Sequence, residues 1–112
     1  MNEETLIFKA PDGILVIPVE AIIYLKSSGN YTLVFSEQVS DPHKICGNLL
    51  YYQSELPENL FIRCHRCFII NINNIYKYVS YKGILVMKNQ GEIPVSRRMR
   101  SNFQKVLKLK VL

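Results

Sequence analysis

The sequence predicts a single domain of mainly antiparallel β structure with two short helices. Short runs of β-branched and aromatic residues follow one another closely and are separated by turn signals. A parallel sheet would need a helix between each pair of strands, and only two stretches have apolar residues at helical spacing. A chain of 112 residues suits one domain that folds without disulfides or metal ions.

Ten β-prone runs are predicted to form strands. Pro11-Asp12-Gly13 has the composition of a tight turn, so residues 5–18 are predicted to form a β-hairpin. Pro18-Val19-Glu20-Ala21 favours a single helical turn, and Ser28-Gly29-Asn30 favours a reverse turn. Further turns are predicted at 82–83 and 89–91, and a polar loop at 36–42. The predicted strands are 5–9, 14–19, 22–27, 31–35, 43–46, 61–64, 68–71, 75–81, 84–87 and 92–95.

The first predicted helix covers residues 48–56. Leu49, Tyr52 and Leu56 recur at helical spacing and would share one face. Asn48 is suited to the N-cap position, and Pro57 ends the helix because it cannot continue the hydrogen-bond ladder.

The second predicted helix covers residues 96–110 and starts with a cluster of arginines. Its apolar face comprises Met99, Phe103, Val106 and Leu107, and Lys110 ends it. Arg97, Arg98 and Arg100 oppose the helix dipole, which prefers anions at this end. A phosphate backbone would supply the missing negative charge. A solvated run of charges without a partner is the alternative.

The charge balance suits an anionic partner such as nucleic acid. Fourteen Lys and Arg against nine Asp and Glu give a formal net charge of +5. No apolar run approaches the ~20 residues that span a bilayer, and the acidic start lacks a signal-peptide pattern. These features predict a soluble, cytoplasmic protein.

The cysteines and the known catalytic motifs favour neither a cofactor site nor an enzyme. Three cysteines argue against a disulfide framework, and Cys64 and Cys67 lack a second pair to complete a zinc site. They are predicted to be buried or half-buried thiols, and no metal or other cofactor is expected. There is no nucleophile elbow, phosphate loop or H-E-x-x-H. A Cys-His nucleophile involving His65 is disfavoured but stays open.

The stretch from Phe61 to Lys77 is the centre of the functional prediction. Its apolar flanks have strand composition and contain no Gly or Pro. Burial of those flanks would hold the polar segment Cys64-His65-Arg66 rigidly at the surface. A cation held in that way is suited to recognition, so the segment is predicted to contact DNA.

Three stretches of the chain resemble the LytTR family of bacterial DNA-binding domains. Residues 23–31, I-Y-L-K-S-S-G-N-Y, are similar to the family pattern I-x-Y-I-E-x-x-x-x-Y. Residues 61–71 are close to F-x-R-x-H-R-S-Y-x-V-N, and residues 93–98, I-P-V-S-R-R, match L-P-V-S-R-R. Their order and spacing fit over nearly the whole chain. Lys26 replaces a common acidic residue, and Cys67 replaces a small polar one.

The resemblance implies an elongated fold of about ten strands whose loops enter successive major grooves. It implies transcription regulation, binding to pairs of direct repeats, a homodimer on DNA, and an attached receiver or sensor domain. It places the segments Asn30/Tyr31, His65/Arg66 and Arg97/Arg98 on the DNA face.

Residue chemistry assigns roles within this expected interface. Arg66 and Arg97 present planar forks that can read guanine in the major groove. Asn30 and Tyr31 can meet bases or phosphates, although Asn30 could instead serve a turn with positive φ. Arg63 and His65 are further candidates. The alternative for Arg63 is a cross-strand ion pair, and for His65 a buried loop-orienting role. The predicted phosphate contacts are Lys26, Lys77, Arg98 and Arg100.

Two other functions stay open at this point. A protein-interaction module could use a sheet edge or a tyrosine-rich surface comprising Tyr51, Tyr52, Tyr76, Tyr78 and Tyr81. Single-stranded nucleic acid could bind by stacking on aromatic rings.

Overall fold

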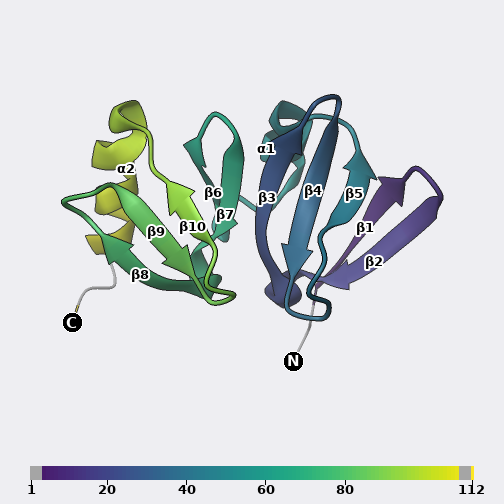
Figure 1. Cartoon of the computed structure of the whole chain (residues 1–112), viewed down its shortest axis with the longest axis horizontal. Helices are drawn as coiled ribbons and strands as arrows, with labels where there is room; N and C mark the ends of the chain where they lie inside the picture. The colour runs from purple at the N-terminus through teal and green to yellow at the C-terminus, as the bar shows by residue number, and fades with distance from the viewer. Residues whose placement is uncertain (1–3, 109–111) are drawn as a thin grey trace.

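In the part of the chain that the structure describes, antiparallel pairing builds three sheets from ten strands, and two α-helices pack beside them (Figure 1). The computed structural model describes residues 4–108 and 112. The molecule measures 41 × 36 × 25 Å along its principal axes. The predicted class, mainly β with two short helices, is confirmed. Within the described part of the chain, no helix has both the length and the apolar character to cross a bilayer.

The first sheet is the predicted hairpin. Strands β1 (Thr5–Ala10) and β2 (Gly13–Pro18) pair in continuous register from Thr5↔Pro18 to Ala10↔Gly13. A 3₁₀ turn, η1 (Val19–Ala21), then leads into the central sheet, as the sequence predicts.

The second sheet is the centre of the molecule and has the strand order β5-β4-β3-β7-β6. Its strands come from two separate parts of the chain. The first part supplies β3 (Ile22–Ser28), β4 (Tyr31–Ser36) and β5 (His43–Cys46). The second part supplies β6 (Phe61–His65) and β7 (Phe68–Asn71), and β3 pairs with β7 to join the two parts.

The third sheet and the helices complete the fold. Strands β8 (Ile75–Val79), β9 (Ile84–Met87) and β10 (Glu92–Pro94) have the order β10-β9-β8. Helix α1 comprises Leu49–Glu55, and the side chain of Asn48 caps it by accepting a hydrogen bond from the Tyr51 amide. Helix α2 comprises Arg97–Lys108, and the predicted end at Lys110 lies outside the described residues.

Two details of the prediction are wrong. The run predicted as 75–81 ends at Val79, because the amides of Lys82 and Gly83 donate to the carbonyls of Val79 and Ser80 in a turn. The 3₁₀ turn η2 (Ile72–Asn74) was not predicted. Its residues fall between the predicted strands 68–71 and 75–81, and the contacts that turn the chain there are distant in sequence.

Burial on both faces holds the central sheet in place. Ile69 and Ile70 are adjacent on β7 and belong to different core clusters, because strand side chains alternate between faces. One cluster packs the sheet against the β1–β2 hairpin and α1. The other packs it against the third sheet and Phe103 of α2. The central sheet is therefore the middle layer of three.

Two buried amides fasten the 3₁₀ turns to each other. Asn71 Nδ2 donates to the carbonyls of Val19 and Ile22 at 3.3 and 2.9 Å. Asn74 Nδ2 donates to the carbonyls of Glu20 and Ile22 at 3.0 and 2.7 Å. Both side chains are buried, so these bonds satisfy amide donors that water does not reach.

We expect Asn71→Ala to lower the free energy of unfolding by about 1–3 kcal/mol, because it removes buried hydrogen bonds to the carbonyls of Val19 and Ile22. Urea denaturation measures the loss. Asn73→Ala is the matched control, since Asn73 lies two residues away in the same turn and is exposed. Equal stability of the two variants would contradict the role of the buried amide.

Candidate nucleic-acid interface

Three chain segments meet along one edge of the molecule. These are the β3–β4 turn, the β6–β7 turn and the start of α2, all at the top of Figure 1. Backbone hydrogen bonds join them. The Ser27 amide donates to the Cys67 carbonyl at 2.9 Å, and the Ser96 amide donates to the Cys64 carbonyl at 2.9 Å. We call residues 28–31, 65–67 and 96–98 the basic edge.

The basic edge carries three arginines and no carboxylate. Arg66, Arg97 and Arg98 are all exposed. Within residues 4–108, no hydrogen bond or ion pair engages their guanidinium groups. The first turn of α2 contains no acidic residue, so nothing on the helix offsets the positive end of its dipole. The edge therefore presents unsatisfied donors and positive charge to solvent.

Asn30 and Tyr31 lie at the tip and the exit of the β3–β4 turn. The left-handed backbone there belongs to Gly29, with φ +60, and Gln90 is the one non-glycine residue of the described chain with positive φ. The alternative that Asn30 serves to tolerate positive φ is therefore wrong. Tyr31 is 39% exposed, and Lys44 Nζ lies 4.9 Å from its ring centroid.

His65 supports the β6–β7 turn from inside. Its Nδ1 accepts a hydrogen bond from the Cys67 amide at 3.1 Å. Its half-buried ring lies edge-on to Phe68, with 5.8 Å between centroids. This geometry fits the loop-orienting alternative, and it leaves Nε2 as the ring atom available for an outside partner.

Arg63 points into the same turn and makes no ion pair there. Its Nε donates to the His65 carbonyl at 3.0 Å, and Nη2 donates to the Arg66 carbonyl at 2.5 Å. Its Nη1 donates to Gln53 Oε1 on α1 at 2.6 Å. The hydrogen-bond partners of Arg63 are thus two backbone carbonyls and a side-chain amide. The alternative expectation, an ion pair with a carboxylate on a neighbouring strand, is not what the structure shows. The sequence did not single out Gln53, because its partner lies ten residues away on another element.

The other predicted phosphate contacts, Lys26, Arg100 and Lys77, lie in three different settings. Lys26 is exposed on β3 next to the basic edge, with Nζ 5.8 Å from the Phe68 ring centroid. Arg100 is half-buried, and its Nε donates to the Val95 carbonyl at 3.2 Å. Lys77 lies on β8, which Figure 1 shows on the lower side of the molecule. The structure does not bring Lys77 to the basic edge.

Gly83 explains why Arg100 can fold inward. Gly83 has φ +65, and a Cβ placed there would collide with the guanidinium group of Arg100. The absent side chain makes room for the guanidinium over the β8–β9 turn. Arg100 therefore packs the start of α2 against the third sheet.

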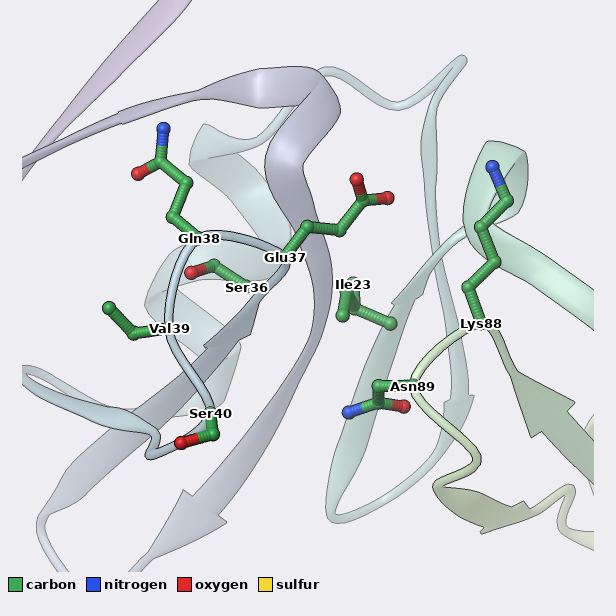
Figure 2. A pocket seen from close by; sticks show the side chains of 8 residues that line it. All are labelled: Ile23, Ser36, Glu37, Gln38, Val39, Ser40, Lys88 and Asn89. Atoms are coloured by element: carbon green, nitrogen blue, oxygen red, sulfur yellow. The ribbon is translucent and has the colours of Figure 1, made fainter.

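A pocket of about 570 Å³ lies away from the basic edge. Figure 2 shows Glu37 and Lys88 on either side of Ile23, with the loop from Ser36 to Ser40 forming one wall. Ser36 and Tyr31 are the two ends of β4, so the pocket and the edge are roughly 17 Å apart along this strand. The polar loop predicted at 36–42 thus lines a surface that the basic edge does not share.

The cysteines are free thiols, and the described residues hold no cluster of His, Cys, Asp and Glu that could bind a metal ion. Cys64 is fully buried, whereas Cys46 and Cys67 are half-buried, as the sequence predicts for such thiols. Burial raises the pKa of the Cys64 thiol to about 12.

A mainly β protein that gathers exposed arginines from a turn and a helix start along one edge has a surface suited to an anionic partner such as nucleic acid. Comparison with known proteins agrees. A family model described as the LytTr DNA-binding domain matches residues 12–108. A solved LytTr DNA-binding domain from Bacillus cereus superposes with a TM-score of 0.78 at 30% identity, covering 95% of this chain and 98% of that one.

Curated relatives include the transcriptional regulatory protein YpdB of Escherichia coli K12, which is 29% identical over 112 residues. That match covers 96% of this chain and 45% of YpdB. The sensory transduction protein LytT of Bacillus subtilis is 26% identical over 109 residues, covering 95% and 44%. The chain thus spans less than half the length of these relatives. It belongs to the LytTR family of DNA-binding domains.

We expect alkylation of the native protein at pH 8 to modify Cys46 and Cys67 well before Cys64. At that pH only roughly one in ten thousand Cys64 side chains would be thiolate, and the atom is buried. Peptide mapping by mass spectrometry measures the three rates. Modification of Cys64 as fast as Cys67 would contradict the assigned burial.

The pH dependence of stability provides a second check on Cys64. Its folded-state pKa lies above the ordinary 9.0, so its contribution to stability is complete below about pH 9 and is lost as pH rises toward 12. In the Cys64→Ala variant, the free energy of unfolding should lose less as the pH rises from about 9 to 12.

Proposed function

We propose that this chain binds specific duplex DNA sequences through the basic edge and regulates transcription in the cytoplasm. One observation carries the proposal. Three segments that are far apart in the sequence meet at one edge without a carboxylate among them, and two of the three present unengaged arginines. The edge runs along the longest axis of the molecule, which measures 41 Å (Figure 1). We assign these turns to successive major grooves of the duplex, which recur every ~34 Å along DNA.

Within this proposal the exposed side chains of the edge read bases and phosphates. Arg66 and Arg97 are assigned to base edges, because a guanidinium fork matches guanine O6 and N7. Asn30 and Tyr31 are assigned to bases or phosphates at the neighbouring turn. Arg98, in the first turn of α2, is assigned to phosphate. A phosphate contact fixes the position of the protein on DNA without reading the base sequence.

The remaining predicted contacts differ in how well the geometry supports them. Lys26 lies beside the edge and is assigned to phosphate. Arg100 and Lys77 are weaker candidates, because Arg100 folds over Gly83 and Lys77 lies on β8. His65 offers Nε2 while its Nδ1 holds the turn.

We also propose that two copies bind paired direct repeats as a homodimer on DNA, with an attached receiver or sensor domain controlling them. The relatives support an attached domain, since they are named as regulatory and sensory transduction proteins and are more than twice as long as the matched region.

The tyrosines support the protein-interaction alternative less well. The Tyr52 hydroxyl donates to the Cys46 carbonyl, and Tyr78 packs edge-on against Phe103. The exposed members, Tyr51, Tyr76 and Tyr81, lie on α1, β8 and the β8–β9 turn. They therefore come from separate elements and lack the shared edge that the arginines have.

Selection of duplexes from a random pool at near-physiological salt tests the proposed function. Recovery of two similar short motifs about one helical turn apart is the expected result. The affinity for the selected duplex should also fall steeply with ionic strength. No enrichment, or a preference for single strands, would contradict the proposal.

Arg66→Ala and Arg97→Ala should each weaken binding to the selected duplex by about 1–3 kcal/mol and relax specificity at one position. Loss of a bidentate base contact is the reason. Fluorescence anisotropy with single-base variants of the duplex measures both effects. Unchanged affinity in both variants would show that another face binds DNA.

Arg98→Ala should weaken all duplexes alike and reduce the slope of log K against log salt by about one. Lys105→Ala is the matched control on the same helix, because Lys105 is exposed in the last turn, away from the helix start. A slope change of the same size in the control would argue for a general charge effect.

A further inference from the structure

The β6–β7 turn is held by side chains that point inward. Arg63 donates to the carbonyls of His65 and Arg66, and His65 Nδ1 accepts from the Cys67 amide. The Cys67 carbonyl accepts from the Ser27 amide of β3. Each of the three consecutive residues 65–67 therefore has a backbone group that is held by a hydrogen bond from outside the β6–β7 pairing.

The guanidinium of Arg63 is itself anchored. Its Nη1 donates to Gln53 Oε1 at 2.6 Å, which ties the turn to α1. Three of the five N–H groups of Arg63 are thus committed to acceptors in three directions. Only a planar fork can meet this arrangement, because a lysine ammonium is a single charged point on a flexible stem.

From these contacts we propose that Arg63 is a positioning residue, anchored by Gln53, that holds the β6–β7 turn in the shape from which Arg66 reads DNA. The inference rests on the proposed function and changes the role expected for Arg63 from contact to support. A pre-shaped turn loses less conformational freedom on binding, so the support favours the cognate duplex over a random one.

The Arg63→Lys variant separates support from direct contact, because it keeps the charge and loses the fork. Positioning predicts about a tenfold loss of affinity for the selected duplex, a similar loss of discrimination against a random duplex, and an unchanged salt slope. A phosphate contact predicts near-normal affinity in Arg63→Lys and a slope reduced by about one in Arg63→Met. That second pattern would overturn the proposal.

The Gln53 variants test the anchor at a surface position where folding is not at risk. Gln53→Ala should lose discrimination a few-fold, and Gln53→Glu should keep it, because a carboxylate accepts the same hydrogen bond. The added negative charge acts on both duplexes alike, so the ratio of affinities is the measured quantity. Ser54→Ala, the next residue of α1, is the control and should match the wild type. An equal ratio of affinities for the selected and random duplexes in wild type and Gln53→Ala would show that Gln53 does not anchor Arg63.

Amide hydrogen exchange of the free protein tests the turn without DNA. The Cys67 amide should exchange several-fold faster in Arg63→Lys than in the wild type, while the amides of β9 stay unchanged. Unchanged exchange at Cys67 would overturn the positioning role. Faster exchange, together with no duplex preference in the wild type, would instead leave the positioning role standing and refute the proposed function.

Discussion

The pairing of β3 with β7 brings two of the three segments of the basic edge, the β3–β4 turn and the β6–β7 turn, to the same end of the central sheet. Both strands belong to tight hairpins, and they run antiparallel to each other, with Lys26 opposite Phe68. Two hairpins joined in this way must place their turns at the same end of the sheet. Burial of Ile69 and Ile70 in opposite core clusters fixes the register, because a shift by one residue would exchange the two faces. The core thus sets the position of the polar edge at the surface.

The cationic side chains near this edge fall into two groups with different uses. Arg63 and Arg100 are half-buried, and their guanidinium groups donate hydrogen bonds to backbone carbonyls. Arg66, Arg97 and Arg98 keep theirs free at the surface. The inward group shapes the turn and the helix start, and the outward group carries the charge that an anionic polymer would meet. Adjacent arginines in one motif therefore perform different tasks.

Local signals were enough to predict most of the fold but not all of the site. Alternating apolar residues and turn residues placed the ten strands and both helices within a few positions, since these features act over short distances in the chain. The η2 turn was not predicted, because Asn71 and Asn74 donate hydrogen bonds to carbonyls about fifty residues earlier in the chain. The same limit applies to Arg63, whose anchor is Gln53, and to Arg100, which needs the space at Gly83. Arg66 and Arg97 were predictable as exposed side chains because a turn and a helix start present them.

Mapping amide chemical shifts during titration with a selected duplex tests the central claim most directly. If the three segments form one surface, the largest changes should occur together at 28–31, 65–67 and 96–98, with little change in the loop at 36–40 beside the remote pocket. Changes concentrated at that loop or on the β1–β2 hairpin, with the three segments unaffected, would contradict the claim.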